Sequence, residues 1–298
     1  MRTSLSSRCP AASSEMVNVS TGMFYSTRPP PTTSPCRPAE RSPERRACLA
    51  PIAPPARHVR PAPGTVTRSA EDRMGSPPVK GFGQGDPALA AWAESVYAPE
   101  DEVLREIRAR SDAAGLPPIH VGRFDGLHLE VLARACAARR IVEIGTLAGY
   151  SGVCLARALP EDGVLHTFEL LERHAALARA AFARAGVAGR VRVHVGPALE
   201  RLREVEGEGP FDLVFVDADK GGYPAYLAWA EEHLRVGGVL LADNTFGFGH
   251  VHEPASAGED AAAMEPLRRF SERLARGGRF RATMLPTAEG LSLGVKVR

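Results

Sequence analysis

The sequence RIVEIGTLAGYSG, residues 140–152, decides the fold class. It begins with a short apolar run at 140–144, passes through Gly145 and enters a helical pattern at 150–158. A glycine after a strand lets the backbone turn sharply and approach a ligand closely. The following helix start would present free N–H groups, with the hydroxyl of Ser151 beside them. We interpret the segment as one strand–turn–helix unit of an open α/β sheet, whose ligands bind beyond the carboxyl ends of the strands.

The same alternation continues along the chain on both sides of this segment. Further apolar runs bounded by turns lie at 164–169, 191–195, 211–217, 238–242, 279–285 and 291–297. Helical patterns lie at 87–97, 100–113, 124–138, 172–186, 198–204, 223–235 and near 265–276. Apolar runs that alternate with helices indicate βαβ units, and Gly290 suits a turn into an antiparallel final pair. We therefore predict an α/β fold, a Rossmann-like, doubly wound, mostly parallel seven-stranded sheet with an antiparallel C-terminal strand.

The N-terminal region differs from the rest of the chain in composition. The first 70 residues hold 12 of the 25 prolines, ten arginines and only three acids. Such a segment buries too little apolar surface to offset its ordering entropy. We therefore predict a disordered Pro/Arg/Ser-rich tail at 1–75 and one domain at 76–298. Three origins of the tail stay open: a targeting presequence, which the dense prolines disfavour, a linker-like tail, or an artefact of translation that really starts near Met74.

The overall composition argues against several classes of protein. The net charge of +2 over 298 residues gives no field that would attract nucleic acid or an anionic membrane. No apolar run reaches the roughly 18 residues of a spanning helix. Five cysteines without a CxxC pair indicate neither a disulfide framework nor a zinc knuckle. We therefore expect a cytoplasmic protein without a membrane partner, and nucleic acid is disfavoured as a partner.

An acid follows the second apolar run at the same edge of the predicted sheet. Glu169 lies 24 residues after Gly145, close to the roughly 20 residues that separate a glycine turn from a ribose-binding acid. The loop lacks the GxGxxG pattern of a pyrophosphate site, and Glu143 adds an acid at the end of the first strand. An acidic loop of this kind favours a donor with a cationic sulfonium over a dinucleotide. The alternative is a plain strand–turn–helix corner without a ligand.

Three side chains that carry oxygen follow the fourth and fifth predicted strands. Asp217 ends FDLVFVD, and GVLLA runs into Asp243 and Asn244. Because parallel strands end at one edge of a sheet, we expect these side chains to converge near Gly145. Hard oxygen ligands suit Mg²⁺, Mn²⁺ or Ca²⁺ rather than Zn²⁺. For each residue the alternative is a cap on the following helix.

Lys220 lies three residues beyond Asp217 in a chain that otherwise uses arginine. The other lysines are Lys80 and Lys296. A lysine serves where an amine must lose its proton, which arginine cannot do. We interpret Lys220 as a proton acceptor, and a surface ion pair with Asp219 is the alternative.

Two histidines and one cysteine are rival chemical groups. His250 and His252 follow the fifth strand, where the sequence predicts a solvated loop or a pocket wall. Cys154 lies on the helix after the glycine turn with no histidine near it by spacing. We expect it to pack in the core and not to act as a nucleophile.

Several segments together resemble the cation-dependent, class I S-adenosylmethionine O-methyltransferase family, which includes caffeoyl-CoA and catechol O-methyltransferases. The segments are VEIGTLAGYSG, VGPALERL, FDLVFVDADKGGY, GGVLLADN and LPTAEGLSLGVK. The resemblance runs from about residue 87 to the C-terminus and leaves the first 75 residues uncovered. The combination of VDADK with a later ADN is specific, whereas the glycine motif alone indicates only a class I methyltransferase.

The resemblance implies roles for individual residues. The implied metal ligands are Asp217, Asp243 and Asn244, and the implied general base is Lys220. The implied donor-binding residues are Val121, Glu143, Gly145, Thr146, Ser151, Glu169, Ala198 and Asp217. The implied cofactors are S-adenosylmethionine and a divalent cation, magnesium or else manganese or calcium. A homodimer and a small phenolic acceptor with a vicinal diol are expected on the same ground.

Departures from the family and rival functions leave the acceptor open. Ser271 follows Phe270 where the family often has asparagine, and the loop at 245–260 is long. One rival is methylation of hydroxylated uridine in tRNA, for which the arginine-rich tail would supply a phosphate-binding arm. A nicotinamide-dependent dehydrogenase on a similar fold would need no Asp243–Asn244 pair. A non-catalytic binding module would bind the donor without turnover.

Overall fold

The structure is a computed structural model that describes residues 86–97, 99–254 and 264–298. The predicted tail at 1–75 lies outside the described residues. Three helices precede the sheet: α1 (Pro87–Tyr97), α2 (Glu102–Ala113) and α3 (Arg123–Ala135). Asp101 caps α2 because its side chain accepts a hydrogen bond from the Leu104 N–H at 3.0 Å. None of the described helices combines the length and apolarity needed to cross a membrane.

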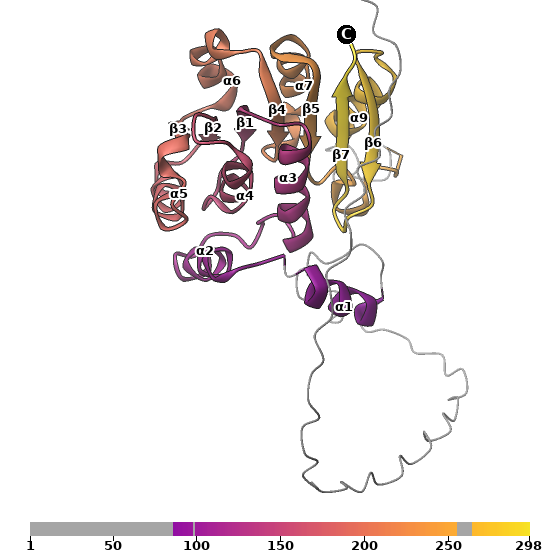
Figure 1. Ribbon diagram of the computed structural model, residues 1–298. Helices are drawn as coiled ribbons and strands as arrows, with labels where there is room; N and C mark the ends of the chain where they lie inside the picture. The colour runs from indigo at the N-terminus through magenta and orange to yellow at the C-terminus, as the bar shows by residue number, and fades with distance from the viewer. Residues whose placement is uncertain (1–85, 98, 255–263) are drawn as a thin grey trace, which may run out of the picture. The chain divides into compact units, whose positions relative to one another are not determined.

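One seven-stranded sheet forms the centre of the domain, in the order β3-β2-β1-β4-β5-β7-β6 (Figure 1). The strands are β1 (Arg140–Ile144), β2 (Val164–Glu169), β3 (Val191–Val195), β4 (Phe211–Val216), β5 (Leu234–Ala242), β6 (Phe280–Leu285) and β7 (Leu291–Lys296). The first five strands pair in parallel, and β7 pairs antiparallel with both β5 and β6. The predicted fold class is therefore confirmed.

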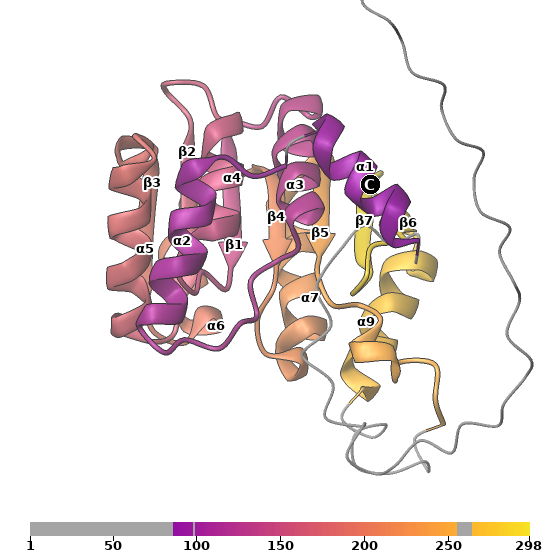
Figure 2. The same cartoon turned by 90° about the horizontal axis from the view of Figure 1, so that it is seen from below.

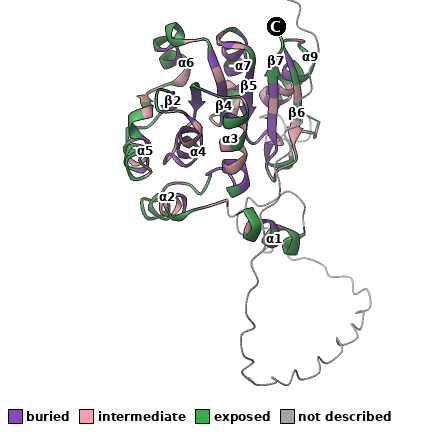
Figure 3. Ribbon diagram, in the orientation of Figure 1, coloured by how far each residue is buried: buried purple, intermediate pink, exposed green. Residues whose placement is uncertain are grey.

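Helices cover both faces of the sheet. They are α4 (Tyr150–Ala158), α5 (Glu172–Arg184), α6 (Ala198–Arg201), α7 (Tyr223–His233) and α9 (Glu265–Arg276). Figure 2 shows α3, α4 and α5 on one face and α7 and α9 on the other. The side chains of β1 alternate accordingly, since Ile141 packs in the core layer under α4 while Val142 and Ile144 pack in the layer under α7. The sheet is buried and the outer helix surfaces are exposed (Figure 3).

Strand register brings the ends of the parallel strands to one level. Ile144 of β1 pairs with Val216 of β4, which pairs with Ala242 of β5. The ladder continues one residue further, because the Asp217 N–H donates to the Ile144 carbonyl at 2.8 Å and the Asp243 N–H donates to the Val216 carbonyl at 3.0 Å. The residues that follow the three strands therefore lie side by side at the carboxyl edge.

Several element boundaries differ from the prediction, and the largest shift is at the junction of α7 and β5. The fifth strand begins at Leu234 and not at 238, and α7 ends at His233. The register between β4 and β5 shifts at this point, and Gly237 has a φ of +79°. A bulge of this kind lets a strand continue through glycines that the sequence pattern marks as a turn. The predicted helix at 198–204 is split into α6 and the 3₁₀ helix η3 (Leu202–Glu204).

Candidate active site

A cavity of about 870 Å³ opens at the carboxyl ends of the parallel strands. Its volume lies within the range of sites for ligands of nucleoside size and larger. The predicted site residues that line it are Val121, Gly145, Thr146, Ser151, Glu169, Ala198, Asp217, Lys220 and Asn244. Glu143 and Asp243 do not line the cavity, and both are fully buried behind it. The structure thus brings nine of the eleven predicted residues to one wall and places the other two beneath it.

The glycine turn after β1 is required by a close approach of two backbones. Gly145 has a φ of +98°, which disfavours residues with a Cβ. A Cβ at this position would lie 1.9 Å from the carbonyl oxygen of Asp217. The turn therefore positions the donor loop directly against the start of the acid-bearing segment after β4.

We expect Gly145→Ala to lower the free energy of unfolding by about 3 kcal/mol or more. The positive φ strains the backbone of an alanine, and its Cβ would overlap with the Asp217 carbonyl oxygen, which no side-chain motion can relieve. Gly186→Ala is the matched control, since Gly186 has a φ of +70° with no atom within 4 Å of an added Cβ. That change should cost about 1–2 kcal/mol. Urea denaturation of the two variants measures both values, and equal losses would contradict the account.

Glu169 is held as an acceptor at the end of β2. One carboxylate oxygen accepts the Leu147 N–H at 2.9 Å, and the other accepts the Leu171 N–H at 3.0 Å. The ring Nδ1 of His174 lies 3.2 Å from the same carboxylate. These donors fix the side chain on the cavity wall, with oxygen lone pairs still available to ligand hydroxyls.

Glu143 is a fully buried acid between the cavity wall and α5. Its Oε2 accepts a hydrogen bond from the Thr167 hydroxyl at 2.5 Å, and that hydroxyl also contacts the hydroxyl of Thr146 on the wall. Burial raises the pKa of Glu143 to about 7, opposed by hydrogen bonds from Ser151 and Thr167. Repulsion from neighbouring carboxylates also raises the pKa. Glu143, which the sequence predicted as a donor-binding residue, is therefore linked to the cavity wall through Thr167 and Thr146.

The raised pKa of Glu143 predicts a pH-dependent stability. The folded pKa of about 7 lies above the ordinary value of 4.5, so the stabilisation is present below pH 4.5 and is lost as the pH rises through 7. We expect the free energy of unfolding of Glu143→Gln, relative to that of wild type, to rise by about 3 kcal/mol between pH 4.5 and pH 8. Urea denaturation at both pH values measures it. The exposed Glu172→Gln is the control, and a pH-independent difference for Glu143→Gln would refute the prediction.

Lys220 lies among the predicted metal ligands and not beside Asp219. Its Nζ donates to the Asn244 Oδ1 at 2.9 Å and to the Tyr223 hydroxyl at 2.6 Å, and it lies 3.4 Å from the Asp217 Oδ1. The Tyr223 hydroxyl in turn donates to the Asp243 carbonyl at 2.8 Å. The amine is thus held at the junction of the β4 and β5 ends.

Asp219 has a structural role at the start of α7. Its carboxylate accepts hydrogen bonds from the Gly222 N–H at 2.8 Å and from the Tyr226 hydroxyl at 2.6 Å. It thereby caps the 3₁₀ helix η5 (Lys220–Gly222) that leads into α7. The alternative of a surface pair between Lys220 and Asp219 does not form.

The oxygen set suits a hard divalent cation. Two of the three predicted ligands, Asp217 and Asn244, already direct a side-chain oxygen at the Lys220 ammonium, and Asp243 is the buried neighbour of Asn244. Asn244 has a φ of +55°, a conformation that asparagine tolerates better than most residues. In the described part of the chain no group of three or more His, Cys, Asp or Glu side chains is placed to hold a metal. The predicted set of Asp217, Asp243 and Asn244 contains only two acids and an amide, so it is not such a group. Its role in metal binding stays a prediction.

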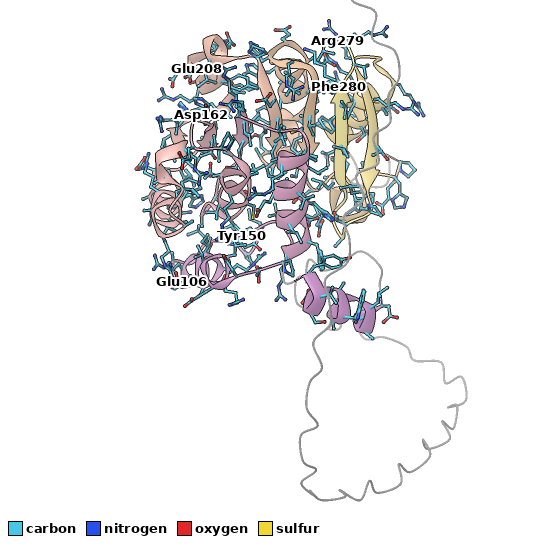
Figure 4. The ribbon with its side chains drawn as sticks, viewed as in Figure 1. Glu106, Tyr150, Asp162, Glu208, Arg279 and Phe280 are labelled. Carbon is cyan, nitrogen blue, oxygen red and sulfur yellow. The ribbon has the colours of Figure 1, made fainter. Side chains whose placement is uncertain are left out.

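The structure adds residues that the sequence did not indicate. Tyr150 lines the cavity, donates to the Glu100 carboxylate at 2.8 Å and carries the Arg108 guanidinium 4.1 Å above its ring. Figure 4 labels the Tyr150 side chain. Phe248 and Glu289 line the other side of the cavity. An aromatic residue at a helix start and an acid in a turn carry no distinctive sequence signal, and their long separation along the chain hides their proximity.

The rival groups lie away from the cavity or in the core. His250 is half-buried and its Nδ1 lies 3.1 Å from the Glu253 carboxylate, and neither His250 nor His252 lines the cavity. Cys154 is buried in the core, and this burial raises the pKa of its thiol. The packing role predicted for Cys154 is confirmed.

Comparisons with known proteins agree with this geometry. The family model for O-methyltransferase matches residues 93–297. A catechol O-methyltransferase of Mycobacterium tuberculosis is 42% identical over 186 residues, which are 62% of this chain and 84% of that protein. The crystal structure of the O-methyltransferase TomG from Streptomyces achromogenes in complex with SAM has a TM-score of 0.66 at 37% identity, covering 71% of this chain and 96% of that one. The structure of an O-methyltransferase from Bacillus cereus in complex with SAH has a TM-score of 0.64 at 37% identity, covering 70% of this chain and 97% of that one.

The match over 93–297 spans more than half of the chain. The chain therefore belongs to the O-methyltransferase family, in the class with catechol and caffeoyl-CoA O-methyltransferases, and it is an enzyme that methylates hydroxyl groups. This membership gives no support to the dehydrogenase alternative.

Proposed function

We propose that the enzyme transfers the methyl group of S-adenosylmethionine to one hydroxyl of a vicinal diol on an aromatic small molecule, with the help of a divalent cation. The observation that carries the proposal is the position of Lys220. Its amine lies within 3.4 Å of oxygens from Asp217 and Asn244, in the same cavity as Glu169. An acid suited to ribose hydroxyls, two side-chain oxygens suited to a cation and a lysine amine thus line one cavity.

The donor would occupy the part of the cavity over β1 and β2. Glu169 suits the ribose hydroxyls, and the turn at Gly145 lets the backbone approach the amino acid moiety. Ala198 and Val121 add wall surface beside them. The relatives from Streptomyces achromogenes and Bacillus cereus were solved with SAM and SAH, respectively, which supports this choice of donor.

Asp217, Asp243 and Asn244 would hold the cation. When bound, a divalent cation lowers the pKa of a diol hydroxyl and orients the two oxygens. Lys220 in its amine form then takes the proton from the hydroxyl that will be methylated, while Tyr223 and Asn244 keep the amine in place. The freed oxygen attacks the sulfonium methyl in line, the carbon–sulfur bond breaks, and S-adenosylhomocysteine leaves. Holding both reactants in attack geometry accounts for much of the acceleration.

A methyl-transfer screen tests the proposal. We would incubate the full chain and S-adenosylmethionine with catechols, a caffeoyl ester and tRNA containing hydroxyuridine, with Mg²⁺ or with EDTA. The proposal predicts methylated catechol-type products that require Mg²⁺. Methylation of tRNA alone would favour the tRNA alternative, and donor binding without any product would favour a binding module.

A further inference from the structure

Glu289 is a buried carboxylate on the cavity wall. It lies in the turn between β6 and β7, is only 5% exposed and lines the same cavity as Lys220. Removing an ionised carboxylate from water is costly unless a hydrogen-bond donor or a cation compensates it. The group that compensates Glu289 is therefore informative about the site.

The other three acids among the lining residues have donors within the protein. Glu169 accepts two backbone N–H groups, Asp217 faces Lys220, and Asp219 accepts from Gly222 and Tyr226. The carboxylate of Glu289 forms no hydrogen bond and no ion pair with any residue in the described ranges. Water or a ligand in the cavity is therefore the remaining source of a partner.

The backbone fixes Glu289 on the side of the cavity away from the donor loop. The Phe246 N–H donates to the Glu289 carbonyl at 3.0 Å, and the Thr245 N–H donates to the Gly290 carbonyl at 3.0 Å. The turn is thus bonded to the segment directly after Asn244. Since β7 lies beyond β5 while the donor loop follows β1, the carboxylate belongs to the acceptor half.

The charges on the lining residues are unbalanced. The described lining contains four carboxylates, at Glu169, Asp217, Asp219 and Glu289, against the single lysine Lys220. A carboxylate or phosphate on an acceptor would meet like charge at Glu289. An ammonium would gain a charge-assisted hydrogen bond there.

We propose that Glu289 determines acceptor specificity by binding a cationic substituent of the aromatic diol, so that the enzyme prefers diols with an ammonium group over diols with a carboxylate. The inference rests on the proposed function, because it assumes that an aromatic diol occupies the acceptor half. Glu289 would act on acceptor binding and not on the reacting atoms.

Three acceptors with the same catechol ring test the proposal: 2-(3,4-dihydroxyphenyl)ethylamine, catechol, and 3,4-dihydroxyphenylacetate. For wild type we expect kcat/KM to be on the order of tenfold higher for the amine than for the acetate. Glu289→Gln should lower kcat/KM for the amine about tenfold, mainly through a higher KM, and should leave kcat/KM for catechol within about twofold of wild type. For the acetate, kcat/KM should be unchanged or higher.

Two control variants separate charge recognition from other effects. Glu289→Asp should retain the preference for the amine, because the charge stays. Glu161→Gln removes an exposed acid before β2, at the opposite edge of the sheet, and should leave all three acceptors unchanged. Thermal unfolding verifies that each variant is folded.

Four results would overturn the inference. One is a loss in Glu289→Gln that is equal for all three acceptors. Another is a rise in the Mg²⁺ concentration that the variant needs, which would make Glu289 a metal ligand. If wild type methylates none of the three diols, the proposed function is itself wrong and the inference falls with it. Methylation of all three diols without a charge preference would contradict this inference and leave the proposed function intact.

Discussion

Lys220→Ala should lower kcat by about 10²- to 10⁴-fold, the usual contribution of a general base, and leave the affinity for S-adenosylmethionine within about twofold. The amine lies at the β4 and β5 ends, bonded to Asn244 and Tyr223, whereas Glu169, the acid proposed to bind the donor, lies at the end of β2. Removing the amine therefore removes the proton acceptor without removing a donor contact. Steady-state kinetics and donor titration calorimetry measure the two effects separately.

Lys220→Arg is the control that separates proton transfer from charge. Arginine keeps the positive charge but does not lose its proton, so this variant should be nearly as slow as Lys220→Ala. A kcat close to wild type for the arginine variant would show that Lys220 acts as a fixed charge. A parallel loss of donor affinity in both variants would instead place the lysine in the donor site.

Removal of the divalent cation should abolish turnover by a factor of 100 or more, an order of magnitude set by the loss of hydroxyl activation and substrate orientation. EDTA treatment followed by gel filtration tests this, and added Mg²⁺ should restore the rate. Asp243→Asn keeps the side-chain shape and removes one charge from the predicted ligand set. This variant should need far more Mg²⁺ and should remain nearly inactive in its absence.

A matched acid away from the cavity controls for the loss of charge. Asp162 is an exposed acid that pairs with Arg139 at the opposite edge of the sheet, so Asp162→Asn should keep the wild-type Mg²⁺ requirement. Full activity of wild type in EDTA, or of Asp243→Asn without added metal, would contradict the metal role.

The carboxyl edge of the sheet could be predicted because the relevant signals are local. Each strand is a short apolar run that ends in a glycine or an acid, and parallel pairing brings such ends together whatever the intervening loops do. The hydrogen bonds from the Asp217 and Asp243 N–H groups to the preceding strands show this alignment. The proximity of Gly145, Glu169 and Asp217 follows from register alone.

Other parts of the site depend on contacts that have no local signal. Glu289 reaches the cavity through a turn bonded to Phe246, more than 40 residues earlier in the chain. Phe248 does so in a left-handed conformation with a φ of +53°, which no sequence pattern would indicate for phenylalanine. Glu143 does not line the cavity, because strand alternation turns its side chain toward the helices on one face of the sheet.

The proton-acceptor role proposed for Lys220 rests on residue choice, whereas its contacts could not be predicted from the sequence. Its nearest acid along the chain is Asp219, yet η5 turns Asp219 toward Gly222 and Tyr226. The helix start thereby leaves the lysine facing Asp217 and Asn244. Only the conformation of residues 217–223 decides between these two partners.

The most direct measurement is transfer of a labelled methyl group from S-adenosylmethionine to catechol by the full chain, with products identified by mass spectrometry. With Mg²⁺ present, the account predicts a catechol that carries one labelled methyl group on oxygen and one S-adenosylhomocysteine for each product. With EDTA it predicts neither. Equal transfer with and without the metal, or no transfer to any aromatic diol under either condition, would contradict the central claim.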